Sequence, residues 1–120
     1  MTDLPAVAYK VLTSPEMAVL IKDGHFTGSQ VDLADGFIHL STAGQLAMTV
    51  EKHFAGQTGL FITAVDLGAL GDAVRWEMSR GGALFPHLYA PLPLSATVAC
   101  GPLERDEAGE PRLPNGNQPG

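Results

Sequence analysis

Two short apolar segments each carry a histidine with a hydroxyl-bearing residue two positions further along the chain. His39 is followed by Ser41, and His87 is followed by Tyr89. Because side chains alternate between the two faces of a strand, each pair is predicted to point to one face of a sheet. Imidazole and hydroxyl groups that are buried without partners cost about 1–3 kcal/mol each. The two segments therefore predict a polar site, built on internal hydrogen bonds or around a ligand.

A carboxylate lies between these segments, at Glu77, next to the single tryptophan, Trp76. A carboxyl group beside an indole can have a raised pKa, as a general acid or base requires. The structural alternative for Glu77 is a salt bridge to Arg75 or Arg80. On the functional interpretation, the catalytic residues are His39, Glu77 and His87, and ligand contacts come from Ser41, Thr42, Trp76 and Tyr89.

Each of these residues also has an ordinary structural role that the sequence leaves open. His39 could be a core histidine whose ring nitrogens bond to backbone carbonyls. Ser41 and Thr42 could cap a helix at residues 43–53, and caps contribute about 1 kcal/mol on their own. Tyr89 could hydrogen-bond to a loop.

Two other kinds of site are alternatives to this one. His39, His87 and Glu77 could converge as a two-histidine, one-carboxylate metal set, but no i,i+4 histidine pair or HExxH spacing supports it, and we expect no metal. A hydrolase triad has less support, because the chain has no Gly-x-Ser-x-Gly segment and Cys100 has no evident histidine partner.

Length and charge limit the class of protein. The chain has 120 residues, of which 45% are hydrophobic, and this suits one globular domain, predicted at residues 1–103. Residues 104–120 are rich in proline, glycine and acidic side chains, and we expect a mobile tail there. The net charge of -6 and the scattered basic residues argue against nucleic acid as a partner. The partner expected at the polar site is a small-molecule or nucleotide ligand.

The single cysteine, Cys100, excludes an internal disulfide, and its apolar surroundings predict a buried thiol. No run approaches the roughly 18 apolar residues of a membrane span, and the N-terminus has an acidic residue in place of a basic leader region. These features predict a cytoplasmic protein that does not enter a membrane.

The apolar patterns predict an α+β fold with two helices in the N-terminal half. The first helix is expected after Thr13 and Ser14, with Pro15 as its first residue, and the second over residues 43–53. Residues 31–36 are interpreted as a turn. Strands are predicted at residues 7–12, 37–40, 60–67, 74–77, 85–88 and 96–100, with 60–67 in the centre of the sheet.

Three motifs resemble one family across about residues 8–100. They are Asp35-Gly36-Phe37-Ile38-His39-Leu40-Ser41, Trp76-Glu77, and Phe85-Pro86-His87-Leu88-Tyr89 with Pro91-Leu92. Together they are similar to the bacterial and plant family called domain of unknown function 952, which is placed in the ADP-ribosyltransferase-like clan. The resemblance implies a curved, split, mixed β-sheet with a cleft for a nicotinamide dinucleotide (NAD), which would be a substrate.

The resemblance also implies roles for particular residues. His39-Leu40-Ser41 is similar to a stretch that borders the dinucleotide site in the RNA 2'-phosphotransferase branch of that clan. The first strand of such enzymes supplies an arginine or histidine that holds the dinucleotide, and Lys10 stands at the comparable place here. Because lysine lacks the planar fork of arginine, two hypotheses follow: an enzyme that transfers or cleaves ADP-ribose, and a non-catalytic module that binds a nucleotide or small metabolite.

Overall fold

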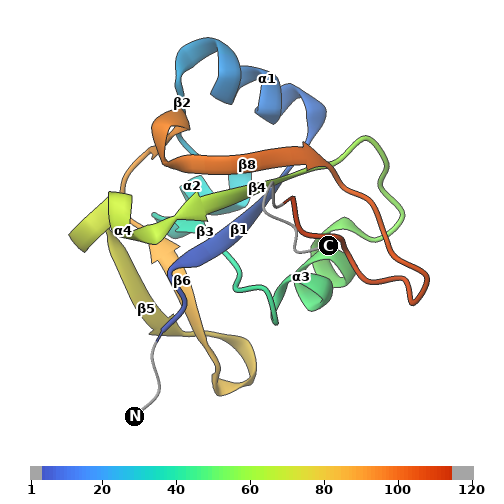
Figure 1. The fold of residues 1–120 in the computed structure, drawn as a ribbon. Coiled ribbons are helices and arrows are strands. Elements are labelled where there is room, and N and C mark those ends of the chain that lie inside the picture. Colours follow the sequence, from blue (N-terminus) through green and yellow to red (C-terminus); the bar gives the residue numbers. More distant parts are fainter. Residues whose placement is uncertain (1–3, 115–120) are drawn as a thin grey trace.

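Three antiparallel sheets form the framework of the protein, whose residues 4–114 are described by a computed structural model (Figure 1). The first sheet has the order β1-β4-β8, with β1 at Val7–Leu12, β4 at Phe61–Asp66 and β8 at Thr97–Pro102. The second has the order β3-β6-β5, with β3 at Ile38–His39, β6 at Leu84–Leu88 and β5 at Val74–Met78. The third pairs β2 (His25–Phe26) with β7 (Leu92–Pro93).

The first two sheets meet at one β-bridge between Tyr9 and Ser41, which we call the seam. The Tyr9 amide donates to the Ser41 carbonyl at 2.7 Å, and the Ser41 amide donates to the Tyr9 carbonyl at 2.9 Å. β1 therefore bonds to β4 along one edge and, along the other, to Ser41, two residues beyond the end of β3. The seam sets the second sheet, and its histidines, next to β1.

Four α-helices lie around these sheets: α1 (Ser14–Asp23), α2 (Gln30–Asp35), α3 (Leu46–Phe54) and the short α4 (Leu67–Leu70). Single 3-10 turns occupy Gly71–Ala73, Arg80–Gly82 and Leu94–Ala96. Thr13 and Glu16 form a capping box that begins α1, and Gly24 ends it in the left-handed conformation. Ser29 and Asp32 form the same kind of box at the start of α2.

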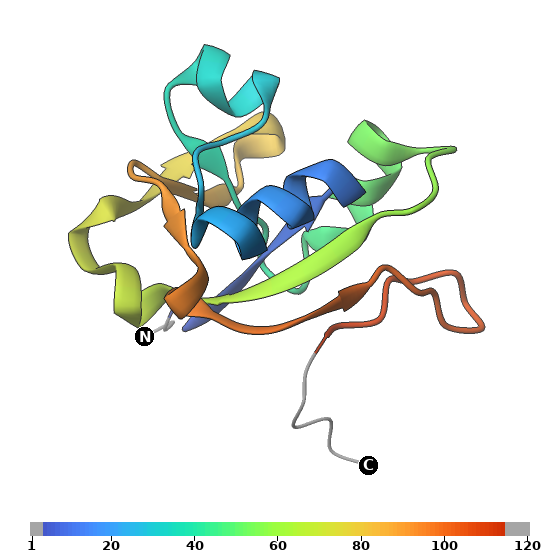
Figure 2. The ribbon, with the colours of Figure 1, turned by 90° about the horizontal axis from the view of Figure 1, so that it is seen from above.

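The apolar side chains form two clusters on opposite faces of the first sheet. α1 contributes Met17 and Leu20 to one cluster, with Ala8 and Leu12 of β1. α3 contributes Leu46 and Val50 to the other, with Val11 of β1. In Figure 1, α1 lies above this sheet and α3 below it, and Figure 2 shows α1 crossing over the strands when seen from above. The alternation along β1 thus supplies a core on both faces.

The structure confirms the α+β class and the predicted strands, with two corrections. Every strand pairing within residues 4–114 is antiparallel, so the sheet is not mixed. Residues 31–36, predicted as a turn, belong largely to α2 and the left-handed Gly36 that caps it. The prediction failed there because α2 is only six residues long and exposes two of its apolar side chains, Val31 and Leu33.

Two local predictions are also wrong. Cys100 is exposed, since β8 is an edge strand and its alternation turns this residue outward. Ser41 and Thr42 do not cap α3, which starts after Gln45 without a side-chain cap. Ser41 is instead buried at the seam.

The segment predicted as a mobile tail starts at residue 104, and its residues 115–120 lie outside the described part of the chain. Within residues 104–114, Arg105 pairs with Pro111 in a β-bridge, and Leu113 packs against the α3 cluster. None of the helices found between residues 4 and 114 is long and apolar enough to span a bilayer.

Candidate functional site

A cavity of about 650 Å³ opens beside the seam and is bordered by residues of β1, α2, β3, β6 and α3. Its polar wall includes Lys10, Asp32, His39, Ser41, Thr49 and His87. Four of these residues were singled out from the sequence, and two, Asp32 and Thr49, were not. Ligand cavities of drug-sized molecules span roughly 300–1,000 Å³, so this one has the size of a binding site.

Asp32 is the buried centre of the first polar cluster. Its carboxylate is 2.9 Å from Lys10 Nζ through Oδ2 and 2.7 Å from His39 Nδ1 through Oδ1. The backbone amides of Ser29 and His39 donate to the same carboxylate at 2.9 and 3.1 Å. Only 2% of the residue is exposed. The capping box at the start of α2 therefore holds a carboxylate that β1 and β3 also use.

The ionisation of Asp32 follows from these contacts. Burial by itself raises the pKa of the Asp32 carboxyl, but the hydrogen bond from His39 and the charge and hydrogen bond of Lys10 lower it by more. The net result is a pKa well below the ordinary value, so Asp32 is ionised at neutral pH. A negative charge is thereby fixed behind the cavity wall.

His39 lies between two carboxylates. Because a carboxylate only accepts hydrogen bonds, Nδ1 of His39 carries a proton and donates a hydrogen bond to Asp32. Nε2 lies 2.9 Å from Oδ2 of Asp35, whose side chain is half exposed. The protonated ring donates to both carboxylates, whereas the neutral ring donates to one. His39 is thus held as a hydrogen-bond donor at the edge of the cavity.

His87 belongs to a second cluster on β5 and β6. Its Nδ1 lies 2.7 Å from Oε1 of Glu77, and the Tyr89 hydroxyl donates to the same oxygen at 2.7 Å. Glu77 is a diagonal neighbour of His87 in the β5–β6 pairing, a spacing that long side chains can bridge. With its proton on Nδ1, neutral His87 has Nε2 as a hydrogen-bond acceptor.

The two hydrogen bonds to Glu77 also set its ionisation. Those from His87 and Tyr89, in that order, lower the pKa of Glu77. The same contact with the Glu77 carboxylate raises the pKa of the Tyr89 hydroxyl. At neutral pH this cluster therefore contains an ionised carboxylate and a neutral phenol.

Aromatic contacts join the two clusters. His39 and His87 are directly opposed in the β3–β6 pairing, and their ring centroids lie 5.6 Å apart in a T-shaped arrangement. Phe37 stacks on His87 at 4.0 Å and lies 4.7 Å from the His39 ring. The sequence prediction that His39, His87 and Glu77 lie close together is consistent with this geometry.

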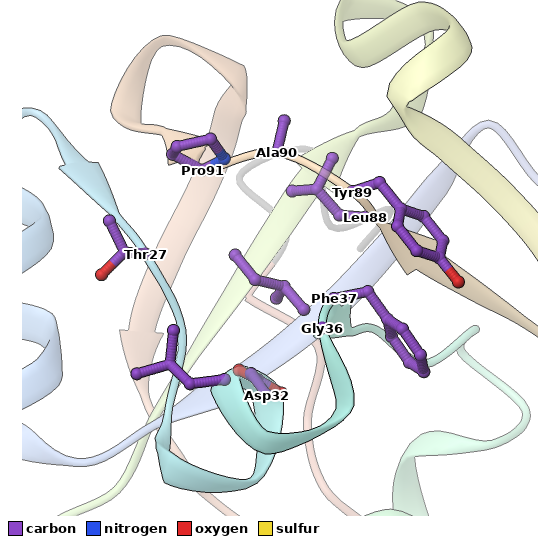
Figure 3. Close-up of a pocket in the computed structure, with 10 residues that line it drawn as sticks. Thr27, Asp32, Gly36, Phe37, Leu88, Tyr89, Ala90 and Pro91 are labelled. Carbon is purple, nitrogen blue, oxygen red and sulfur yellow. The ribbon is translucent and has the colours of Figure 1, made fainter.

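Phe37 also borders a second, smaller cavity of about 260 Å³. Figure 3 shows the rings of Phe37 and Tyr89 near each other on one side of it, with Thr27 across from them. Arg75 lies over the Tyr89 ring, 5.1 Å from its centroid. Asp32 lines both cavities, whereas Phe37 and Tyr89 line only the smaller one.

The remaining predicted ligand residues divide into those at the cavity and those away from it. Lys10 and Ser41 line the large cavity, but Lys10 is already bound to Asp32. Trp76 packs against the α1 core cluster, because the alternation of β5 turns it away from the face of Arg75 and Glu77. Thr42 does not line the cavity, and its backbone amide bonds to the Gln45 side chain.

Sequence reasoning missed Asp32, Thr49 and Phe37. The spacing Ser29-x-x-Asp32 before the glycine at 36 is a capping-box pattern and could have indicated the helix that positions Asp32. Thr49 is 2.7 Å from the Ser41 hydroxyl, a contact between α3 and the seam that sequence spacing alone does not indicate. Phe37 lies in the motif at residues 35–41, where the sequence pattern indicates only an apolar strand residue.

The alternative metal set of His39, His87 and Glu77 does not form as such. Glu77 uses its oxygen on Nδ1 of His87, so these groups bond to each other instead of converging on a common point. In the described range, 4–114, no group of three or more histidine, cysteine, aspartate or glutamate side chains is placed to hold a metal ion.

Comparison with solved structures identifies relatives of the same fold. The crystal structure of protein CC0527 from Caulobacter crescentus is 47% identical, with a TM-score of 0.81, and the match covers 89% of this chain and 94% of that one. The solution NMR structure of CC0527 is 46% identical, with a TM-score of 0.77, and covers 91% and 94% of the two chains. No curated protein matches this chain.

A family model described as "Protein of unknown function (DUF952)" matches residues 11–100. This range contains α2, Ser41 of the seam, both histidines and the carboxylates that bind them. The chain therefore belongs to the DUF952 family of proteins of unknown function.

Proposed function

We propose that the large cavity binds a nicotinamide dinucleotide or a related nucleotide and transfers or cleaves its ADP-ribose. One observation carries the proposal: His39 and His87, each fixed at Nδ1 by an ionised carboxylate, meet on the wall of a cavity of about 650 Å³. The similarity of His39-Leu40-Ser41 to a dinucleotide-binding stretch supports the choice of ligand.

The two histidines have different tasks in this proposal. His39 binds a hydroxyl group of the nicotinamide ribose through Nε2, in exchange for the contact of that nitrogen with the half-exposed Asp35 carboxylate. His87 offers Nε2 as a base. Glu77 acts through His87 and is a positioning residue, because it bonds to the ring nitrogen that faces away from the ligand.

The proposed reaction breaks the bond between the ribose carbon and the nicotinamide nitrogen, and the electron pair leaves with nicotinamide. The oxygen of an acceptor hydroxyl, or of water, forms the new bond to that carbon, and its proton passes to Nε2 of His87. Positive charge develops on the ribose as the first bond lengthens, and the ionised Asp32 and Asp35 behind His39 stabilise that charge electrostatically.

One observation favours the second hypothesis, a non-catalytic nucleotide-binding module. Lys10 stands where a dinucleotide anchor is expected, and it is 92% buried and paired with Asp32 at 2.9 Å. Its charge is therefore balanced before any ligand arrives. A protein with this arrangement can bind a nucleotide without holding it for reaction.

Titration with oxidised NAD, followed by histidine NMR resonances and by an assay for released nicotinamide, tests both hypotheses. Under the enzyme hypothesis, saturable shifts at His39 and His87 accompany nicotinamide release. His87→Asn then keeps binding and loses most of the release, while His39→Asn weakens binding. His25→Asn is the matched control, since His25 is exposed on β2 and does not line the cavity.

The outcomes separate the hypotheses. Binding without nicotinamide release identifies the module. Equal release by His87→Asn and His25→Asn contradicts the role of His87. An absence of shifts at saturating NAD rejects both forms of the proposal for this ligand.

A further inference from the structure

The wall of the large cavity has a second polar region, on α3, that the histidines do not reach. Three neighbouring residues of this helix, Thr49, Lys52 and His53, line the cavity. Leu46 and Val50 face the core on the other side of the same helix. Residues three and four positions apart share a helix face, so Thr49, Lys52 and His53 form one polar strip.

The hydroxyl groups of Ser41 and Thr49 have an unused hydrogen-bond donor. They lie 2.7 Å apart, and either can donate to the other. Whichever accepts that bond keeps its own O–H, and no protein acceptor for it is found in the part of the chain that the structure describes. Ser41 is buried and both residues line the cavity. The pair therefore directs one donor to whatever occupies this space.

Lys52 supplies a charge at the same place. Among the lysine, aspartate and glutamate side chains on the cavity wall, the others are already bonded: Lys10 and Asp32 to each other, Asp35 to His39, and Glu16 to the Thr13 amide. Lys52 has no salt-bridge or hydrogen-bond partner within residues 4–114. Its charge remains available to a ligand.

We propose that Lys52, together with the Ser41–Thr49 hydroxyl pair, binds a phosphate group of the ligand. An ammonium group and a hydroxyl donor are a common combination for a phosphate oxygen. This inference rests on the proposed function for its choice of ligand, and it assigns the orientation: phosphates at α3, and the ribose at His39 and His87. Lys52 thus takes the place of the cation that Lys10 does not supply.

The test measures affinity by calorimetry for three probes: oxidised NAD, inorganic pyrophosphate, and nicotinamide riboside, which has no phosphate. Lys52→Gln is expected to weaken NAD and pyrophosphate binding by about tenfold and to leave the riboside unchanged. Thr49→Val is expected to weaken the same two probes by a smaller factor. Lys22→Gln is the control, since Lys22 lies on α1 and does not line the cavity.

A two-dimensional NMR spectrum of each variant shows that its fold is intact. Equal affinities of Lys52→Gln and Lys22→Gln for NAD overturn this inference and leave the proposed function standing. Binding of pyrophosphate that depends on Lys52, with no binding of NAD, supports the phosphate site and rejects the proposed ligand. If neither NAD nor pyrophosphate binds the unmodified protein, both proposals fail.

Discussion

The two histidine–carboxylate pairs of the cavity are built with opposite burial. In the Asp32–His39 pair the carboxylate is buried, with 2% of its side chain exposed, and the ring has 34% exposed. In the Glu77–His87 pair the ring has 6% exposed and the carboxylate 37%. The hydrogen bonds have the same length, 2.7 Å. Identical local geometry therefore serves two different environments.

This difference in burial predicts different roles for the two carboxylates: Asp32 stabilises the fold, and Glu77 orients His87. A buried ionised carboxylate needs all its partners, because an unpaired buried charge is strongly destabilising. An exposed carboxylate is solvated by water when a partner is removed. We therefore expect Asp32 to contribute to the stability of the fold, and Glu77 to contribute mainly to the orientation and tautomer of His87.

Of the variants proposed here, Asp32→Asn is expected to have the largest effect on stability, because it removes the buried carboxylate of the first pair. It leaves the Lys10 ammonium buried without its counter-charge, and we expect the free energy of unfolding to fall by about 3 kcal/mol. Urea unfolding followed by circular dichroism measures the change. Asp35→Asn is the control, since that carboxylate also bonds to His39 but is half exposed, and we expect it to change the stability by about 0.5 kcal/mol. Equal losses in the two variants would contradict the contrast.

The pH dependence of stability tests the same carboxylate without a mutation. Because the pKa of Asp32 is lowered in the folded protein, its contribution is present above the unfolded-state pKa of about 3.9 and is lost as the pH falls toward the folded value. We expect the stability difference between the unmodified protein and Asp32→Asn to shrink steadily from about pH 5 to pH 2. A difference that stays constant over this range would show that the charge of Asp32 is not its source.

Glu77→Gln tests the second pair, in which the carboxylate is the more exposed partner. The amide oxygen can still accept from His87, but the charge that strengthens the bond is gone. We expect the downfield proton resonance of His87 Nδ1–H to move upfield, while the urea midpoint changes much less than in Asp32→Asn. Glu51→Gln, on the exposed face of α3, serves as the control and should leave that resonance in place. A collapse of stability in Glu77→Gln would remove the distinction between the two pairs.

Tyr89→Phe should have the smallest effect. It removes one of the two donors to Glu77 and leaves the His87 bond, which lowers the Glu77 pKa more. The pKa of Glu77 should therefore rise part of the way to its ordinary value, with the fold unchanged. Carbon-13 NMR titration of the Glu77 carboxyl measures this rise, and an unchanged pKa would show that the Tyr89 hydroxyl does not bond to Glu77 in solution.

The alternation of side chains along strands was the most useful sequence rule for predicting which site residues lie together. It put His39 with Ser41 on one face and His87 with Tyr89 on another, since strand geometry repeats every two residues whatever the rest of the fold does, and the first pair lines the cavity while the second shares Glu77. The same rule, applied to β5, would have excluded Trp76, which has the opposite parity to Glu77. Proximity of Trp76 to Glu77 in the chain was mistaken for proximity in space.

Contacts between elements were less accessible to sequence reasoning. Asp32 lies on a helix of six residues, too short for a periodic apolar pattern to identify. The Ser41–Thr49 contact depends on how α3 packs against the seam, which no local pattern specifies. The family resemblance drew attention to Lys10, but the ion pair of Lys10 with Asp32 follows only from the position of α2.

The Lys10–Asp32 ion pair has a mechanical consequence for the molecule. Lys10 belongs to the first sheet, while Asp32 lies beside β3 of the second, so the ion pair crosses the boundary that the Tyr9–Ser41 bridge also crosses. A shared apolar cluster also packs Ala8 and Leu12 of the first sheet with Ile38 and Leu88 of the second, and the large cavity takes its walls from both sheets. Protonation of Asp32 in acid removes the charge that holds the Lys10–Asp32 ion pair and leaves the Tyr9–Ser41 backbone bridge intact. The ion pair thus couples β1 to α2 across the wall of the cavity, and protonation of Asp32 at low pH is expected to weaken that coupling.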